Sequence, residues 1–588
     1  MKTRDQIEDK YKWDLDMFKT TADIDAVFDT IEKLTKVLPS YYGKFNDKDK
    51  FFEYFNNYKD DWLKIEKMCF YISNTQMTNL TDVSILKLAE RFSNSYNKLN
   101  KAISFVDPQI DDLDEDYLLS LLNDERAKDL DVKIKEVIKN KPHRLDEKTN
   151  EILSKMDNSF NNSYTIYDLL QNSEMKYQDA KDSKGKTHKV DNSTYTNLIS
   201  SKDREIRKSA FNSMINAYAD INKTISELYL SSVKTAFEFS RLQNYNSTLE
   251  RMLHNNDVPL AVFEKNIEQV FKHKNLFQNF IKTQAKISGI KDFSTFDIFE
   301  DKKVGGKIKI EKAQEIMLKS LAPLGVEYLK IVNHKLNDKS IDYLTNKDKY
   351  SGGYCDNAYD TKTVILLNWT YDYDSLSALV HEMGHCVNAE YFNSAQPMEK
   401  ADTTTFAAEI ASTVNELLLG IYIQNNCTTK HKSYYINQFL NQISSSIFKT
   451  TMYTEFELFA HNSIQNELLI TYQDLNDKCY KLNKKYYGNS CLIPNSIKYQ
   501  WSKISHFYRP FYYYCYSTGM ITAINIVSNI LKDSSYVNKY IMFLKNGLNK
   551  PAYDILKEIG IDLATDTPYE IAFDFFKQQL EEYKKLSV

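Results

Sequence analysis

The segment 375–388 constrains this chain more than any other, because residues 381–385 read H-E-x-x-H. Residues four apart on a helix lie on one face, one turn from each other, so His381 and His385 can both bind a single metal ion. Glu382 lies about 100° further round the helix, within reach of a water molecule on that ion. This arrangement is the minimum that metal-assisted hydrolysis requires.

The pattern alone does not establish a metal site, since two histidines and a glutamate also occur as merely polar neighbours. With ten histidines in 588 residues, chance produces the pattern roughly once in a hundred such chains. The apolar residues around it recur at the three- and four-residue spacing of a buried helix: Leu376, Leu379, Val380, Met383 and Val387. Buried imidazoles and carboxylates need partners, and a metal ion is the simplest one. We expect Asp374 or Ser375 to cap this helix and residues 393–397 to end it.

A catalytic zinc site needs a third protein ligand and an open position for water. The next predicted helix, 403–418, carries Glu409 among apolar neighbours, which is a poor setting for an unpaired carboxylate. Glu416 follows two turns later on the same face. We therefore assign Glu409 as the third ligand and Glu416 as the acceptor for the free ring N–H of a ligand histidine. The alternative for Glu416 is a solvated helix residue.

Amide hydrolysis also needs hydrogen-bond donors for the oxyanion that forms on the attacked carbonyl. The aromatic segment 504–519 is the best source, since an imidazole and phenol hydroxyls can all donate. It contains His506 and three candidate tyrosines: Tyr513 lies three residues before Tyr516 and Tyr512 lies four before it, so each can share its face of a helix. On composition alone, an aromatic core helix is the simpler interpretation.

The low content of helix breakers favours a mainly α fold, with 14 glycines and 10 prolines in 588 residues. Apolar residues at helical spacing predict a series of helices, interrupted at 107–108, 111–112 and 141–142, over residues 24–38, 51–70, 83–99, 118–160, 201–242, 259–287 and 406–588. We divide the chain into an N-terminal helical lobe (1–115), a helical segment with a β-hairpin (116–200) and a catalytic domain (201–588).

Two short regions show the signals of β-strands. Alternating residues on either side of 182–185 predict a hairpin with a glycine turn. Residues 350–355 and 364–367 predict strands just before the 381–385 pattern. A strand edge beside a metal can bind an extended peptide as an additional strand, so we assign Gly352 and Gly353 to substrate binding. Plain core packing explains these glycines equally well.

Composition gives no support for nucleic-acid or membrane partners. The formal net charge is −4, and no apolar run approaches the length of a membrane span or forms a secretion signal. The seven cysteines include no C-x-x-C pair, as in proteins of a reducing compartment. We expect a cytoplasmic protein with no nucleic-acid or membrane partner, and the oligomeric state stays unknown.

The 381–385 pattern is followed by F-A-A-E-I-A-S around Glu409 and by H-F-Y-x-P-F-Y from His506. Together these motifs strongly resemble the oligoendopeptidase F branch of the thimet oligopeptidase family of zinc metallopeptidases. The likeness extends over nearly the whole chain, through Y-K-W-D-L at 11–15, D-R-E-I-R at 203–207 and the region 547–563.

The resemblance implies a mainly α, two-lobed helical metallopeptidase with a deep central substrate channel and a small β-sheet beside the zinc helix. It implies one Zn2+ per chain, held by His381, His385 and Glu409. It also implies an endopeptidase that hydrolyses short unstructured oligopeptides through a zinc-bound water activated by Glu382.

The resemblance places the oxyanion donors on His506 and a pair of tyrosines. The thimet pattern Tyr-Tyr-x-Tyr fits Tyr513, Tyr514 and Tyr516. Members of the oligoendopeptidase F branch usually carry an aliphatic residue at the position of Tyr513, so Tyr512 or Tyr514 is the alternative partner of Tyr516.

Two other functions stay open at this point. A carboxypeptidase-type helical zinc peptidase would need a cationic pocket for the terminal carboxylate of its substrate. A non-catalytic peptide-binding protein on the same scaffold would need no base, and the presence of Glu382 with a complete ligand set argues against it.

Overall fold

The computed structural model describes residues 2–15, 17–160, 162–300, 304 and 306–586. The described chain is mainly α with two small sheets, which confirms the predicted fold class.

The N-terminal helices share a hydrophobic cluster of their own, which buries apolar side chains between residues 27 and 134. The run predicted over 51–70 is two helices, because α2 ends at Asn56 before α3 begins at Lys59. The break predicted at 107–108 is wrong: Pro108 lies in the first turn of α5, where a missing N–H removes no intrahelical hydrogen bond. The helices are α1 (Thr21–Val37), α2 (Lys48–Asn56), α3 (Lys59–Thr78), α4 (Val83–Ile103), α5 (Val106–Asp111), α6 (Glu115–Leu122) and α7 (Asp131–Asn140).

The predicted hairpin is confirmed as β1 (Ala180–Lys181) and β2 (Thr187–His188), which pair antiparallel. Gly185 closes the turn with a φ of +79°, a conformation that glycine adopts without strain. The interruption predicted near Lys141 is also present, since α7 ends at Asn140. Along the chain, α8 (Glu147–Phe160) and α9 (Asn162–Leu169) precede the hairpin and α10 (Asn192–Ile199) follows it. The domain boundaries at 115 and 200 stay a prediction.

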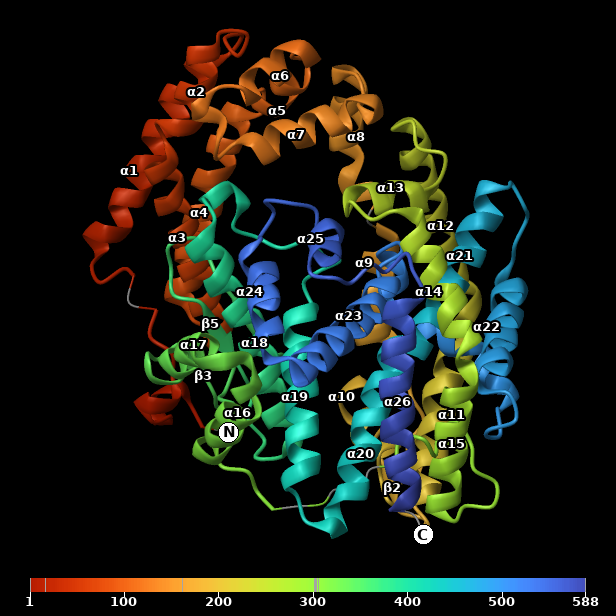
Figure 1. Ribbon diagram of the computed structural model, residues 1–588. Helices are drawn as coiled ribbons and strands as arrows, with labels where there is room; N and C mark the ends of the chain where they lie inside the picture. The colour runs from red at the N-terminus through yellow and green to blue at the C-terminus, as the bar shows by residue number, and fades with distance from the viewer. Residues whose placement is uncertain (1, 16, 161, 301–303, 305, 587–588) are drawn as a thin grey trace.

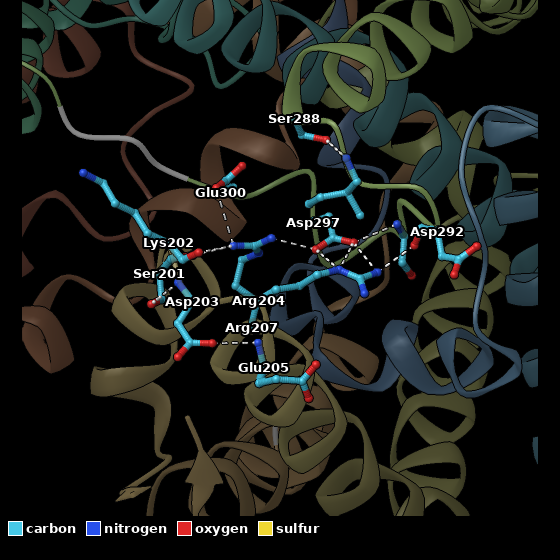
Figure 2. A network of polar contacts seen from close by, with 12 residues as sticks. Ser201, Lys202, Asp203, Arg204, Glu205, Arg207, Ser288, Asp292, Asp297 and Glu300 are labelled. Atoms are coloured by element: carbon cyan, nitrogen blue, oxygen red, sulfur yellow. Dashed lines mark hydrogen bonds and ion pairs between the residues drawn. The ribbon is translucent and has the colours of Figure 1, made fainter. Parts of the chain in front are cut away.

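The D-R-E-I-R segment holds the start of the next helix against a loop far along the chain. Asp203 caps α11 by accepting from the N–H of Glu205, and Arg204 and Arg207 both form ion pairs with the buried Asp297, at 3.0 and 2.8 Å. Figure 2 shows the side chains of Arg204 and Arg207 converging on Asp297. The helices of this region are α11 (Arg204–Asp220), α12 (Asn222–Leu242), α13 (Thr248–Asn255), α14 (Leu260–Lys272), α15 (Lys274–Ser288), α16 (Ile310–Ser320) and α17 (Gly325–Asn337).

The second sheet has three strands in the order β3 (Ile341–Asp342), β5 (Val364–Leu366) and β4 (Tyr354–Asp356). The strand predicted at 364–367 is present and fully buried, and the strand signal at 350–355 corresponds to β4. Strand β3 has no signal in the sequence, because two residues are too short to show an alternating pattern. Within the described chain β4 pairs with β5 alone, so it is an edge strand, and it contacts the helix that carries the 381–385 pattern.

That helix is α18 (Tyr373–Ala395), and its cap is Asp372, which accepts from the N–H of Ser375, rather than Asp374 or Ser375 as predicted. The helix predicted over 403–418 begins later, as α19 (Ile410–Asn426). Before it the chain forms turns in which the carbonyl of Thr404 accepts from two backbone N–H groups. Glu409 therefore stands at the amino end of α19, preceding its first turn.

The remaining helices complete the carboxyl-terminal part: α20 (Thr429–Ser444), α21 (Thr450–Gln465), α22 (Tyr472–Tyr487), α23 (Tyr513–Lys532), α24 (Val537–Lys545), α25 (Ala552–Glu558) and α26 (Thr567–Lys585). α19 packs against α18 and against α23. In Figure 1 helices α1–α8 curve over the left and top of the molecule, and α11, α12, α15, α22 and α26 line its right side. Helices α18, α19 and α23 lie between these two parts (Figure 1).

No helix in the described part of the chain combines the length and the apolar character needed to cross a membrane.

Candidate metal centre

Three side chains from two helices bring their ligand atoms together. The Nε2 atoms of His381 and His385 lie 3.2 Å apart, as the i,i+4 spacing on α18 predicts. The Oε2 atom of Glu409, at the start of α19, lies 3.5 Å from Nε2 of His381 and 3.6 Å from Nε2 of His385. Among the described residues this is the one cluster of three metal-ligand side chains found at such close range.

The spacing of these three atoms fits zinc. Ligand atoms about 2.0–2.1 Å from a tetrahedral zinc are separated from one another by about 3.3–3.4 Å, and the three distances lie near that value. The local charge also favours a cation. Burial lowers the pKa of His381, but the hydrogen bond and charge of Glu416, with the charges of Glu382 and Glu409, raise that pKa overall to about 9. A field that stabilises a protonated imidazole stabilises a divalent cation for the same reason.

Glu416 lies beside one of the two histidines. Its Oε1 atom is 3.4 Å from Nδ1 of His381, the ring nitrogen that points away from the ligand cluster. The other carboxylate oxygen accepts from Nε2 of Gln442 on α20 at 2.7 Å, so the carboxylate is held from both sides. Gln442 lies outside the motifs, and no periodicity in the sequence points to it.

Glu382 lies under the edge of the second sheet. The backbone N–H of Cys355 on β4 lies close enough to this carboxylate to lower its pKa. Burial is the main cause that raises the pKa of Glu382 to about 6, opposed by the charge of His381 and assisted by that of Glu409. A carboxylate with a raised pKa can accept a proton near neutral pH and return it.

Gly384 was not singled out in the sequence, yet it determines how closely α18 and α19 approach. A Cβ atom at this position would lie 2.5 Å from Cα of Ser412 and 2.8 Å from the carbonyl oxygen of Ala411, both backbone atoms of α19. Because α19 carries Glu416 and follows Glu409 directly, this contact positions both carboxylates against the histidines. A glycine inside an otherwise apolar helix is the signal that could have revealed it.

The aromatic segment forms a second group of polar side chains. His506 lies in a short 3-10 helix (Ser505–Tyr508), and Tyr516 lies in the first turn of α23 with its hydroxyl 3.4 Å from Nε2 of His506. Burial and the charge of Arg509 lower the pKa of His506, so its imidazole is neutral at neutral pH. Burial raises the pKa of Tyr516 above its ordinary value, so that its hydroxyl keeps its proton.

The three candidate tyrosines face different surroundings. Burial is the main cause that raises the pKa of Tyr512 and of Tyr516, and the charge of Glu409 adds to the rise in both. The ring of Tyr513 instead lies 5.2 Å from that of Tyr453 and 5.2 Å from the imidazole of His506. Tyr514, the alternative partner, is fully buried in the core.

The predicted substrate-binding glycines directly precede the edge strand. The carbonyl of Gly352 accepts from the side chain of Asn368 at 2.9 Å, and a Cβ atom on Gly352 would collide with the ring of Tyr350. Gly353 is exposed, and a Cβ atom there would lie at 3.4 Å from the carbonyl oxygen of Leu366. A Cβ atom on Gly352 would thus require the exposed Tyr350 ring to move, whereas one on Gly353 would make an ordinary contact. The role of both glycines toward a substrate stays a prediction.

Comparison with known proteins places this geometry in a family. Residues 197–575 match the model of peptidase family M3, and residues 110–177 match the oligopeptidase F N-terminal model. The chain is 31% identical over 591 residues to oligopeptidase PepF of Bacillus subtilis, covering 99% of this chain and 88% of the relative. It is 30% identical over 595 residues to an oligoendopeptidase F homolog of Borreliella burgdorferi, covering both chains completely.

Solved structures share the fold. A Chlamydophila abortus peptidase superposes with a TM-score of 0.92 at 24% identity, over the full length of both chains. Oligoendopeptidase F from Enterococcus faecium gives a TM-score of 0.73 at 24% identity, over 96% of this chain and 99% of that one. The matched sequence models, the full-length relatives and the H-E-x-x-H helix agree: this chain is a peptidase that belongs to peptidase family M3, in its oligoendopeptidase F branch.

Proposed function

We propose that this peptidase is a zinc-dependent endopeptidase that hydrolyses short unstructured oligopeptides. The observation that carries the proposal is the triangle of His381, His385 and Glu409 ligand atoms, with edges of 3.2, 3.5 and 3.6 Å, next to Glu382 in a chain of family M3. Those three residues would hold one Zn2+, and Glu416 would keep His381 in the tautomer that binds through Nε2. When bound, the zinc ion supplies Lewis acidity for the water and for the peptide carbonyl.

Glu382 acts as the general base in this proposal. Its carboxylate takes a proton from the attacking water and later passes it to the leaving amine. The backbone N–H of Cys355 favours the charged form of that carboxylate, which is the form that accepts the proton.

His506, Tyr512 and Tyr516 act as donors to the oxygen of the tetrahedral intermediate. The hydroxyl group of Tyr516 next to Nε2 of His506, and the position of Tyr512 and Tyr516 toward Glu409, support this assignment. One well-placed donor of this kind contributes about 3–4 kcal/mol to transition-state stabilisation. Tyr513 would support the imidazole of His506 from behind, with its ring centroid 5.2 Å away.

The substrate binds in extended form along β4, with Gly353 as the point of close approach. An open strand edge beside Glu382 supports this orientation, because main-chain pairing accepts many sequences. A channel between the two helical lobes would restrict access to short, unfolded peptides. The cytoplasm suits a chain whose seven cysteines are all free thiols.

The test uses a fluorogenic nonapeptide with the purified protein, with and without a chelator. We expect cleavage that the chelator abolishes and that one equivalent of zinc restores. Glu382→Gln should keep one zinc per chain and the affinity for peptide but lose turnover. Wild-type turnover in that variant would show that Glu382 is not the base, and cleavage insensitive to chelators would exclude a metal mechanism.

The position of the cut separates the endopeptidase from a carboxypeptidase. A peptide with an amidated carboxyl terminus lacks the charge that a carboxypeptidase recognises. Mass spectrometry of its products should show internal cuts at an undiminished rate. Removal of single residues from the free-acid peptide, with no cleavage of the amidated one, would favour the carboxypeptidase.

A further inference from the structure

The connection between His506 and helix α23 contains one residue in an unusual backbone conformation. Phe511 has a φ of +54°, in the left-handed region that residues with a side chain rarely adopt. Arg509 before it is extended, and Tyr512 after it is helical. A single left-handed residue therefore turns the chain from the His506 segment into the first turn of α23. Such a conformation persists only where surrounding contacts enforce it.

The contact that enforces it comes from another helix. The backbone N–H of Phe511 donates to Oε1 of Glu457 on α21 at 3.0 Å, and the Glu457 side chain is fully buried. The other carboxyl oxygen of Glu457 has no hydrogen-bond partner within the described chain. The bond to Phe511 is thus the polar contact that this buried carboxyl group makes.

The aromatic ring of Phe511 is held by rings of two other helices. It lies 4.7 Å from the imidazole of His461, one turn after Glu457 on α21, and 5.8 Å from the ring of Phe263 on α14. Both the N–H and the ring of Phe511 are therefore bound to the core, which leaves the residues on either side in one arrangement. In that arrangement Nε2 of His506 lies 3.4 Å from the hydroxyl of Tyr516.

We propose that Glu457 is a positioning residue for the oxyanion donors, acting through the N–H of Phe511 to keep His506 and Tyr516 side by side. The inference rests on the proposed function in so far as these donors serve the reaction. It adds a residue that touches neither substrate nor metal ligands and lies outside the motifs that identify the family.

Glu457 acts as a neutral acceptor. Burial holds its pKa well above the ordinary value for a glutamate, against the opposing effect of the Phe511 N–H, and so favours the neutral carboxyl group. A glutamine at this position offers the same carbonyl oxygen without a charge, whereas a leucine fills a similar volume and offers no acceptor. The two substitutions therefore separate the hydrogen bond from simple filling of space.

The experiment compares Glu457→Leu, Glu457→Gln and a control on the same helix, Glu455→Leu. Glu455 lies two residues earlier and accepts from Lys485 and Tyr486 instead, away from the 511 turn. For Glu457→Leu we expect kcat on the fluorogenic nonapeptide to fall about ten- to one-hundred-fold with KM within about twofold. Glu457→Gln should lower kcat by no more than about threefold. Glu455→Leu should change thermal stability but not kcat.

A phosphinic peptide mimics the tetrahedral oxyanion. Its affinity separates the two possible roles of Glu457, because a purely structural role would leave that affinity unchanged. Glu457→Leu should weaken its inhibition by the same factor as kcat, while the affinity for an uncleaved product peptide changes less than about twofold. Zinc content should stay at one per chain in all variants. A crystal structure of Glu457→Leu should show φ of residue 511 changed and His506 separated from Tyr516.

A folded Glu457→Leu protein with wild-type kcat and wild-type phosphinic inhibition would overturn the inference. So would a crystal structure in which the 511 turn and the His506–Tyr516 separation are unchanged. His506→Ala distinguishes this failure from failure of the proposed function. If that variant keeps its kcat, the donor role is wrong, and the crystal structure of Glu457→Leu alone then decides whether Glu457 positions the segment.

Discussion

Substitution of Gly384 by alanine tests whether the crossing of α18 and α19 sets the geometry of the metal centre. The new methyl group would lie 2.5 Å from Cα of Ser412, and 2.8 Å from both the carbonyl oxygen of Ala411 and the nitrogen of Ser412. These are backbone atoms inside a packed helix pair, so no side-chain rotation relieves the contact. Ordinary van der Waals separation is restored only if the two helices move apart by about 1 Å.

That displacement is large on the scale of metal coordination. Zinc–ligand distances are maintained within about 0.2 Å, whereas the histidines stay with α18 while Glu409 and Glu416 move with α19. We expect Gly384→Ala to weaken zinc binding at least about 10–100-fold, and to lower kcat/KM about a hundredfold even with zinc in excess. Overpacking of this kind also destabilises the fold by about 1–3 kcal/mol.

Two alanine variants serve as controls. Gly519 lies inside α23, where a Cβ atom would meet nothing within 4 Å, so Gly519→Ala should bind zinc normally and gain up to about 1 kcal/mol of stability. Gly420 lies on α19, where a Cβ atom would meet the ring of Phe439 at 2.4 Å, a side chain that can move. Gly420→Ala should therefore destabilise the fold with a smaller effect on zinc.

Zinc affinity is measured by competition with a chromophoric chelator, activity with the fluorogenic nonapeptide, and helix content by circular dichroism. If Gly384→Ala binds zinc and cleaves peptide like the wild type while keeping its helix content, the contact with Ser412 does not position the carboxylates.

Three further predictions follow from other buried groups. Glu416→Gln should weaken zinc binding about 10–100-fold, because the charge that orients His381 from 3.4 Å is lost; an unchanged zinc Kd in chelator competition would contradict this. Burial and the charge of Arg251 lower the pKa of His461 to about 3, so between about pH 6.5 and 3 the unfolded chain binds a proton that the folded chain does not, and stability falls as pH falls. Urea unfolding between pH 4 and 6 gives the slope of the free energy of unfolding against pH. This slope should be smaller for His461→Leu than for the wild type by up to about 1.4 kcal/mol per pH unit, and equal slopes in both proteins would refute the assignment. The side chain of Lys349 is fully buried and donates to Asp342 at 2.6 Å and to the carbonyl of Leu367 at 2.6 Å. Lys349→Met should lower the free energy of unfolding by about 3 kcal/mol. A melting temperature close to that of the wild type, measured by thermal unfolding, would contradict that.

The sequence by itself determined the parts of the candidate metal centre that depend on local spacing. The 3.6-residue period of a helix puts His381 and His385 on one face wherever α18 lies, and Glu416 follows Glu409 by two turns. The apolar setting of Glu409 marked it as a carboxylate in need of a partner. The mainly α fold followed from scarce glycine and proline and from the helical spacing of apolar residues. Each of these inferences uses contacts within about one or two helical turns.

Only the tertiary structure decided the features that arise between distant segments. The need for glycine at 384 depends on how near α19 approaches, and the side of His506 on which each tyrosine lies depends on how α23 packs against α19 and α21. The left-handed Phe511 is bound by Glu457, 54 residues earlier in the chain. The two-residue strand β3 exists because β5 lies beside it, and α19 begins at Ile410 because turns precede it. Such contacts join residues far apart in sequence, and the periodicity of neighbouring residues carries no signal for them.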